Sequence, residues 1–354
     1  MYATRVETDL DAFRHNLEQA KKLLPQGVAI MAVIKDEAYG HGAYELALEA
    51  LQGGAKMLGV ATVEEGVQLR SEGIVAPILV LCGLTPEEVE ETVENRLSIT
   101  LYSREMAGLI NAAALKWGRK VPVHLKIDTG MGRLGILPEE AKPFQEEFQS
   151  LTGLVVEGVM THFAAAPEAD TAYSSTQLHR FQGVLSFFLS SEVGAERPIA
   201  HAANSAAVLN LPQSCLDMVR LGILLYGCNP CLETMRKIPL RPVLTWKTCV
   251  LSLKRVPSGS WIGYDRTYCT SRDSLLAILR VGYADGYSRA LSNRAQVLIQ
   301  GKRVPLIGRI SMDICAVDAT ELPSLREGEE VVLLGRQGEE EITAHELASL
   351  QETI

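Results

Sequence analysis

Eight short apolar runs, separated by segments of helical character, constrain the fold of this chain more than any other feature of its sequence. Each run has the length of one strand that is buried on both faces, and such strands form parallel sheets covered by helices. Eight strand–helix units within roughly 250 residues is the number that closes a (β/α)8 barrel. The runs cover residues 28–34, 57–61, 77–81, 97–102, 122–127, 154–160, 199–203 and 218–225.

Helices are predicted between most of these runs. Several of them begin with a capping residue or with proline, as at Thr85, Pro86 and Pro138. An open, doubly wound sheet is the alternative fold. It is less favoured because no GxGxxG motif follows the first run and because the number of strands is high. The helical segments cover residues 44–51, 64–71, 86–95, 104–117, 138–148 and 177–190.

The pattern changes after Pro239, where apolar runs are separated by short turns such as Ser258-Gly259. Helical periodicity returns only at residues 344–350. We therefore predict an α/β fold with two domains, a TIM barrel over residues 1–236 and a mostly β domain over residues 237–354. The runs of the second domain cover residues 243–253, 275–281, 295–300, 304–310, 314–317 and 330–334.

Composition argues against several kinds of partner and compartment. A net charge of −9 and a pI near 5.4 disfavour nucleic acid and anionic membrane surfaces, which attract basic proteins. No apolar run reaches the length of a bilayer span, and the N-terminus has no signal-peptide core. Seven scattered cysteines are typical of reduced thiols, so we expect a cytoplasmic protein. Cys228 and Cys231 have CxxC spacing, but a lone pair is weak evidence, and no metal is predicted.

Lys35 is the first candidate for chemistry, because it stands at the C-terminal end of the first apolar run. Desolvation lowers the pKa of an amine, and an uncharged lysine is a nucleophile. The ordinary alternative is a lysine that snorkels from a strand end. The following turn favours a ligand site, since Gly40 and Gly42 let the backbone approach a ligand and Tyr39 beside them can hold a phosphate.

Other unusual side chains follow the ends of later runs, where the reactive groups of a barrel gather. His162 alone would more often be a core histidine, and Arg220 alone would more often be a paired arginine. Their convergence on one rim favours function. In the fifth run, His124 and Lys126 alternate with apolar residues, so an inward-facing Lys126 would be a buried cation. A salt bridge and a carbamate on its amine are the two alternatives for its neutralisation.

Together these residues resemble the alanine racemase family, which uses pyridoxal phosphate and has fold type III. The match covers nearly the whole chain in the same order. The resemblance implies a (β/α)8 barrel, a β domain and a head-to-tail homodimer with active sites at the interface. The matching segments are Lys35 with residues 38–42, residues 126–133, 161–163, 204–205 and 220–222, and, in the second domain, residues 262–265, 282–286 and 308–313.

The resemblance assigns the cofactor, pyridoxal 5′-phosphate, to the barrel. It implies that Lys35 forms the Schiff base and that Arg220 faces the pyridine nitrogen. Because an arginine keeps its proton, that nitrogen stays unprotonated, which favours simple loss and return of the α-proton over transamination. The groups assigned to the cofactor phosphate are Tyr39, Asn204, Ser205 and the backbone amides of Gly222 and Ile223.

The resemblance also implies racemisation of alanine by two bases acting on opposite faces of the aldimine. Lys35 would handle the α-proton of the D-enantiomer, and Tyr264 of the partner subunit that of the L-enantiomer. A tyrosine with an ordinary pKa of about 10 needs help to act as a base. His162, hydrogen-bonded onward to Arg220, would provide it.

An isomerase that supplies D-alanine for peptidoglycan is the leading functional prediction. Arg133 and the amide of Met312 from the partner would bind the substrate carboxylate, the arginine as a fork onto two oxygens. The alternatives are a racemase of another small amino acid such as serine, a decarboxylase or aldolase on the same fold, and a catalytically impaired paralogue. The hairpin that carries Tyr264 speaks against a different reaction.

Three departures from the family pattern stand out. Asp36 and Glu37 add acid beside the cofactor phosphate, and Ala166-Pro167 replaces an Ala-Asp pair that lines the substrate entrance. The chain ends at Ile354 without a counterpart of the family's last phosphate-binding tyrosine. We therefore expect the family's C-terminal segment to be missing.

Overall fold

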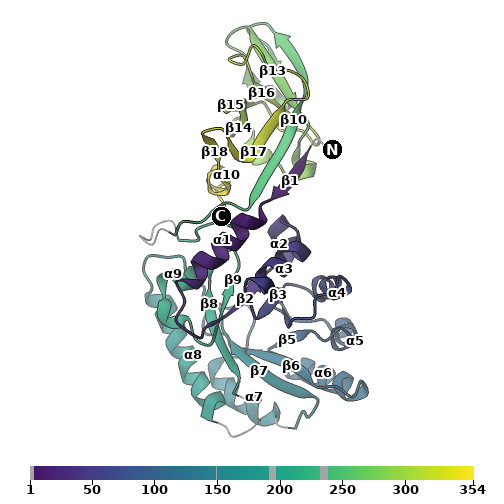
Figure 1. The fold of residues 1–354 in the computed structure, drawn as a ribbon, viewed down its shortest axis with the longest axis vertical. Coiled ribbons are helices and arrows are strands. Elements are labelled where there is room, and N and C mark those ends of the chain that lie inside the picture. The colour runs from purple at the N-terminus through teal and green to yellow at the C-terminus, as the bar shows by residue number, and fades with distance from the viewer. Residues whose placement is uncertain (1–3, 149, 191–196, 232–237) are drawn as a thin grey trace. The chain divides into compact units, whose positions relative to one another are not determined.

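Eight parallel strands close into a barrel in their order along the chain, which confirms the predicted fold class (Figure 1). The computed structural model describes residues 4–148, 150–190, 197–231 and 238–354. The open-sheet alternative is wrong, because β2 pairs with β3 on one side and with β9 on the other. The barrel strands are β2 (Ala29–Val33), β3 (Met57–Val60), β4 (Ile78–Val80), β5 (Ser98–Leu101), β6 (Val121–Lys126), β7 (Leu154–Met160), β8 (Ile199–Asn204) and β9 (Met218–Leu221).

Helices lie around the outside of these strands (Figure 1). Local signals begin several of them, such as the capping box between Thr62 and Glu65 at the start of α4. Helices α1 and α9 were not among the predicted segments. The helices are α1 (Leu10–Lys21), α2 (Lys35–Gly40), α3 (Ala43–Gln52), α4 (Val63–Ser71), α5 (Val89–Glu94), α6 (Arg104–Lys116), α7 (Ala141–Phe148), α8 (Ala172–Ser190) and α9 (Ser205–Asn210), with 3-10 turns at Pro86–Glu88, Pro138–Glu140 and Pro212–Ser214.

The interior of the barrel combines an apolar layer with buried polar side chains. Met31, Met57, Leu79, Met160 and Met218 pack together as one cluster. On β6, His124 is fully buried and its ring hydrogen-bonds to a histidine of β8, while Lys126 is 5% exposed. The polar face of the fifth predicted run therefore points into the barrel.

The rest of the chain forms a β unit in which β10 pairs with both β13 and β17, so that six strands close a ring. All pairs in this ring are antiparallel. The elements are β1 (Arg5–Thr8), β10 (Leu244–Val256), β11 (Trp261–Ile262), β12 (Tyr268–Cys269), β13 (Ser274–Leu279), β14 (Gln296–Ile299), β15 (Lys302–Ile307), β16 (Cys315–Asp318), β17 (Glu330–Gln337), β18 (Glu340–Ile342) and α10 (Ala344–Leu350), with 3-10 turns at Tyr264–Arg266, Tyr283–Asp285 and Arg289–Leu291.

The division into units differs from the predicted one at the N-terminus. The barrel unit spans Leu10–Arg241, and the β unit combines Met1–Asp9 with Pro242–Ile354. The reason is β1, which pairs antiparallel with β10 from Arg5↔Lys247 to Thr8↔Leu244. The predicted boundary between residues 236 and 237 touches residues outside the described part of the chain.

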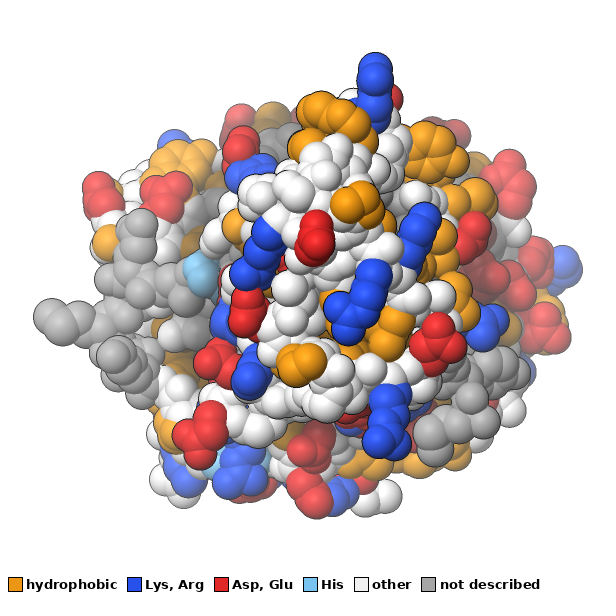
Figure 2. Space-filling view, turned by 90° about the horizontal axis from the view of Figure 1, so that it is seen from above, with side chains coloured by type: hydrophobic (Ala, Val, Ile, Leu, Met, Phe, Trp, Pro, Cys, Tyr) orange, Lys and Arg blue, Asp and Glu red, His pale blue; other side chains and the backbone are white. Residues whose placement is uncertain are grey.

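Acidic and basic side chains are interspersed with apolar ones on the face seen in Figure 2, and neither charge sign dominates that face. No helix in the described part of the chain combines the length and the apolar character that a membrane span requires. No disulfide joins any two of the seven cysteines.

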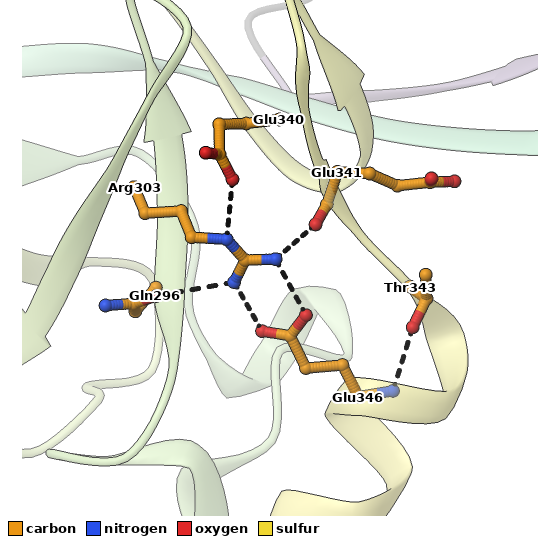
Figure 3. A network of polar contacts seen from close by, with 6 residues as sticks. All are labelled: Gln296, Arg303, Glu340, Glu341, Thr343 and Glu346. Atoms are coloured by element: carbon orange, nitrogen blue, oxygen red, sulfur yellow. Dashed lines mark hydrogen bonds and ion pairs between the residues drawn. The ribbon is translucent and has the colours of Figure 1, made fainter.

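Arg303 on β15 joins the sheet of the β unit to α10 (Figure 3). Its guanidinium donates two hydrogen bonds of 2.7 and 3.0 Å to the carboxylate of Glu346, and its Nε donates to Glu340 at 2.9 Å. It also donates to the carbonyl of Glu341. The hydrogen bonds from Glu346 and Glu340 hold the pKa of Arg303 above its ordinary value. This bidentate, networked geometry makes the group more stabilising than an isolated surface pair.

Replacing Arg303 with methionine is expected to lower the free energy of unfolding by about 1–2 kcal/mol, because two carboxylates lose their charged donor. Urea unfolding followed by tryptophan fluorescence measures this change. Arg336→Met is the matched control, since its ion pair with Glu341 at 3.1 Å lies on a side chain that is 74% exposed. The control is expected to change stability by no more than about 0.5 kcal/mol. Equal losses in the two variants would contradict the role given to Arg303.

Candidate active site

The chain enters a left-handed helical turn directly after the first barrel strand. This turn is α2, and residues 36–39 have φ between 52° and 55°. Left-handed backbone costs roughly 1–2 kcal/mol for each residue with a side chain. The sequence predicted a turn eased by Gly40 and Gly42, whereas the strained residues precede the glycines. Strain of this kind is concentrated at functional sites.

Contacts from other elements hold the turn in place. The hydroxyl of Tyr226 donates a hydrogen bond to the carbonyl of Val33 at 2.9 Å. The ring of Tyr226 contacts those of Tyr39 and His41, with centroids 4.8 and 4.7 Å apart. The amide of Asp36 donates to a Glu65 carboxylate oxygen at 2.6 Å. These contacts offset the backbone strain, and no sequence motif had singled out Tyr226.

Lys35 begins this turn, and its ammonium lies 3.1 Å from a carboxylate oxygen of Asp36. Burial lowers the pKa of Lys35, but the hydrogen bond to Asp36 and nearby Tyr39 and Cys82 raise it more, so that the pKa lies above its ordinary value. The expectation that desolvation leaves Lys35 uncharged is therefore wrong for the ligand-free protein. The physical reason is Asp36, one of the residues that departs from the family pattern.

A cup of hydrogen-bond donors lies beside the turn. The hydroxyl oxygen of Ser205 accepts hydrogen bonds from the amides of Gly222 at 3.0 Å and Leu224 at 3.4 Å. A Cβ on Gly222 would lie 2.8 Å from the Tyr39 hydroxyl, so a larger residue at this position would displace that hydroxyl. Burial raises the pKa of Tyr39, which keeps its hydroxyl a donor. Within the described residues, the amide of Ile223 and the hydroxyl protons of Ser205 and Tyr39 have no acceptor.

Arg220 on β9 is a buried cation, 4% exposed. Its guanidinium donates to the carbonyls of Thr161, His201 and Ala202 at 2.7, 3.0 and 2.9 Å. Burial lowers its pKa to about 10, so the group stays charged near neutral pH. No carboxylate of the described residues lies within ion-pair distance of it. Its charge is therefore balanced by dipoles and by neighbouring histidines.

His162 is one of these histidines, and its Nδ1 lies 3.2 Å from Nη2 of Arg220. Burial and the charges of Arg220, Lys126, Arg133 and Lys35 lower the pKa of His162 to about 3. His162 is therefore neutral near pH 7. Because an arginine only donates, Nδ1 accepts and the imidazole proton resides on Nε2.

Lys126 also lies in this cationic environment. Burial and the charges of Arg133 and Arg220 lower its pKa to about 8. No carboxylate of the described chain pairs with its amine, so the salt-bridge alternative finds no support. The predicted residues Lys35, Lys126, Arg133, His162 and Arg220 thus lie close enough for their charges to shift one another's pKa values. The rim that they form is electropositive. Such a rim attracts anionic groups.

Three turns of the β unit come together although they are distant in the sequence. A Cβ on Gly308 would lie 2.9 Å from the carbonyl oxygen of Ile262, and a Cβ on Gly282 would overlap the Met312 carbonyl. The amide of Ala284 donates to that same carbonyl at 3.0 Å. Close backbone packing therefore explains Gly282 and Gly308.

These turns present Tyr264 and Met312 at the surface, where they are 68% and 55% exposed. Asp265 follows Tyr264 with φ of 60°, and its carboxylate lies 2.7 Å from Nε of Arg309. The amide of Met312 has no acceptor within the described residues.

Comparison with known proteins assigns the chain to a family. The sequence model of the alanine racemase N-terminal domain matches residues 8–230, and that of the alanine racemase C-terminal domain matches residues 243–354. The chain belongs to the alanine racemase family. Alanine racemase from Halothermothrix orenii is 44% identical over 351 residues, which cover 99% of this chain and 92% of that protein.

Solved structures of the family share the fold. Alanine racemase from Clostridium difficile 630 has a TM-score of 0.93 and 36% identity, and the match covers 100% of this chain and 92% of that one. Alanine racemase from Bacillus anthracis with bound L-Ala-P has a TM-score of 0.91 and 38% identity, covering 100% and 91% of the two chains. The predicted family and its two-domain architecture are confirmed.

The expected loss of the family's C-terminal segment is not supported. The C-terminal domain of the alanine racemase family is matched as far as residue 354, and the structure folds this part into β10 to β18 and α10. The expectation rested on one tyrosine motif, whereas the domain is specified by strand pairs along its whole length.

Replacing Asp36 with asparagine is expected to lower the pKa of Lys35, because the variant loses the negative charge that raises it and keeps only a neutral acceptor oxygen. The fraction of free amine then rises at a given pH, and labelling of Lys35 by acetic anhydride shifts to lower pH. Peptide mass spectrometry of protein freed of small ligands measures the labelling rate.

Glu37→Gln is the matched control for this variant. Its carboxylate accepts a hydrogen bond from the amide of Ala43 at 3.1 Å and is not among the groups that shift Lys35. An unchanged labelling profile in Asp36→Asn, or an equal shift in the control, would show that Asp36 does not set the pKa of Lys35.

Proposed function

We propose that this protein is an alanine racemase, an isomerase that interconverts L-alanine and D-alanine. One observation carries the proposal. Lys35 on a strained turn, the charged Arg220 and the neutral His162 share one rim of the barrel in a chain of the alanine racemase family. The bound L-Ala-P in the Bacillus anthracis structure supports alanine as the substrate.

The cofactor is pyridoxal 5′-phosphate, and the barrel fits it. The cup of free donors suits a phosphate, Arg220 offers a permanent charge to a ring nitrogen, and Lys35 offers an amine to an aldehyde. When bound, pyridoxal phosphate withdraws electrons from the substrate's α-carbon and makes its proton acidic. The residues that would hold it are Lys35, Tyr39, Asn204, Ser205, Arg220, Gly222 and Ile223. In the structure the side-chain oxygen of Asn204 caps α9.

Two residues exchange the α-proton, one on each face of the substrate. Lys35 takes and returns the proton of D-alanine, and Tyr264 of the partner subunit takes and returns that of L-alanine. His162 helps as a neutral donor through Nε2, with Arg220 polarising it from the other side of the ring. The help that a tyrosine base needs is therefore a hydrogen bond from a polarised imidazole.

The functional unit is a homodimer whose sites draw residues from both subunits. Tyr264 and Met312 are exposed in the single chain, which supports their use by a partner. The free amide of Met312 and the guanidinium of Arg133 bind the substrate carboxylate. D-alanine made in this way would serve peptidoglycan synthesis in the cytoplasm, a compartment that suits seven cysteines without a disulfide.

The protein, supplied with pyridoxal phosphate and L-alanine in deuterated water, is expected to produce D-alanine that carries deuterium at the α-carbon. Chiral chromatography with mass spectrometry measures both changes. Lys35→Ala is expected to abolish turnover. Tyr264→Phe is expected to lose at least about 100-fold in racemisation, while D-alanine still exchanges its α-proton through Lys35. Absence of both deuterium and D-alanine with the unaltered protein would refute the proposal.

Mixed dimers test the shared site within the same experiment. Co-expression of Lys35→Ala with Tyr264→Phe gives about half mixed dimers, each with one complete site, so about a quarter of normal activity should return. Each variant expressed alone is the control. Failure to recover activity, with mixed dimers shown to form by differential tags, would place both bases in one subunit.

Lys126 carries a carbamate. Its amine is buried, lacks a carboxylate partner among the described residues and has a pKa of about 8, so a reactive neutral fraction exists near neutral pH. The ammonium first releases one proton, the neutral amine nitrogen then bonds to the carbon of carbon dioxide, and a second proton leaves the nitrogen, so that a buried cation becomes an anion. That anion balances the charges of Arg133 and Arg220.

Protein equilibrated with isotopically labelled bicarbonate is expected to show a carbamate signal in carbon magnetic resonance. Lys126→Arg should remove the signal, because a guanidinium does not form a carbamate under these conditions. Lys35→Ala is the control and should keep it, since Lys35 is ion-paired and cationic. A signal that survives Lys126→Arg would disprove the assignment.

A further inference from the structure

A line of hydrogen bonds runs from Arg220 across the barrel interior to Glu157. Nη1 of Arg220 lies 2.9 Å from Nδ1 of His201, and Nε2 of His201 lies 2.7 Å from Nδ1 of His124. Nε2 of His124 then lies 3.0 Å from Oε2 of Glu157. Both imidazoles are fully buried. The hydroxyl of Ser98 donates to the same carboxylate oxygen at 3.0 Å.

The two ends of this line fix the position of every proton in it. An arginine only donates, so Nδ1 of His201 accepts and the proton of His201 resides on Nε2. That proton is donated to Nδ1 of His124, which leaves the proton of His124 on Nε2. An ionised carboxylate only accepts, and Glu157 receives this last proton. Burial and the charge of Arg220 also hold the pKa of His201 well below its ordinary value.

A β-bulge delivers Glu157 to this position. In the pairing of β6 with β7, Val123 faces Val156 and His124 faces Gly158. Glu157 is therefore an extra residue on β7 that faces no residue of β6. Such a bulge redirects a side chain that regular alternation would place elsewhere. It brings the Glu157 carboxylate to His124 and Ser98 inside the barrel.

The next residue makes room for the imidazole. A Cβ on Gly158 would overlap the ring of His124, since the ring rests directly on the backbone of β7. The bulge and the glycine together serve one purpose, which is to seat a histidine between a carboxylate and a second histidine. Packing alone gives no reason for this polar arrangement in an interior that also holds a cluster of methionine and leucine side chains.

We propose that Glu157 is a positioning residue for the racemase site and that it acts through the ordered protons of His124 and His201 to hold the guanidinium of Arg220. The inference rests on the proposed function, because that function assigns Arg220 to the cofactor ring. Glu157 also supplies the negative charge that Arg220 lacks at close range. The charges are separated by two neutral rings, so Nη1 and Nη2 of Arg220 keep their hydrogen bonds to the carbonyls of His201 and Thr161, and Nη2 stays 3.2 Å from Nδ1 of His162.

Without the Glu157 carboxylate, the protons of His124 and His201 are no longer fixed on Nε2. With leucine at position 157, the Nε2 proton of His124 has no acceptor, and either imidazole gains by moving its proton to the other nitrogen. A proton on Nδ1 of His201 would then face the Nη1 proton of Arg220, and the guanidinium would have to turn. Glutamine keeps an acceptor oxygen but no charge, so Glu157→Gln separates the hydrogen bond from the electrostatics.

Magnetic resonance of holoenzyme with isotope-labelled histidine reports which nitrogen of each ring carries the proton. His124→Gln and His201→Gln assign the two signals. In the unaltered enzyme, we expect both rings to be neutral and protonated on Nε2. Glu157→Leu should lose this order and lower kcat by about tenfold or more with little change in KM, since a buried donor loses its acceptor. Glu157→Gln should keep the order and lose less activity.

Glu90→Gln is the control. It removes a carboxylate bonded to Lys116 and Trp117 on the outer helices and should change neither the histidine signals nor kcat.

A proton on Nδ1 of either histidine in the unaltered enzyme would overturn the proposal. So would a Glu157→Leu variant with unchanged tautomers and kcat. Should that variant fail to fold, Gly158→Ala displaces His124 while keeping Glu157, and it must disturb the same signals. An unaltered enzyme that does not racemise alanine would refute the proposed function, whereas the tautomers would still decide the hydrogen-bonded line.

Discussion

The buried charge of Arg220 in the barrel determines the protonation and hydrogen bonding of the groups around it. A buried cation without an adjacent carboxylate must be compensated by dipoles and polarisable neighbours. Three backbone carbonyls and two histidines provide this compensation. The same charge disfavours protons on His162 and contributes to the lowered pKa of Lys126. The rim therefore carries the positive charge of Arg220 beside a neutral His162. Such a rim suits a cofactor and a substrate that both carry negative charge.

The sequence predicted the barrel well because its strands are short and buried on both faces, which leaves continuous apolar runs. It did not predict β1, whose four residues find their partner in β10, more than 230 positions later. The rim residues were predicted as single positions at strand ends, where a barrel gathers its chemistry. Glu157 was missed for a local reason. The run over residues 154–160 was predicted only as a buried apolar strand, and the bulge that turns Glu157 toward His124 leaves no compositional signal apart from Gly158.

Lys35 shows where reasoning from residue type fails. Burial alone would lower its pKa, and the sequence supplies no orientation for Asp36 that would counter this. The left-handed turn supplies one, because successive side chains in that conformation project differently from those of a strand or an ordinary helix. The protonation of the lysine thus depends on backbone strain in residues 36–39, and that strain depends in turn on the packing of Tyr226.

The strained turn over residues 36–39, the bulge at Glu157 and the buried charge of Arg220 share one property. Each is unfavourable by itself, and each is held by contacts from a different element: Tyr226 against the turn, Gly158 beneath His124, and carbonyls of β8 and its neighbours around Arg220. Regular strands and helices would place side chains on a barrel rim but would leave the lysine solvated and the arginine free to rotate. The irregular features restrict both groups to one arrangement. The packed core therefore stabilises local conformations that the chemistry requires and that the local sequence would not adopt alone.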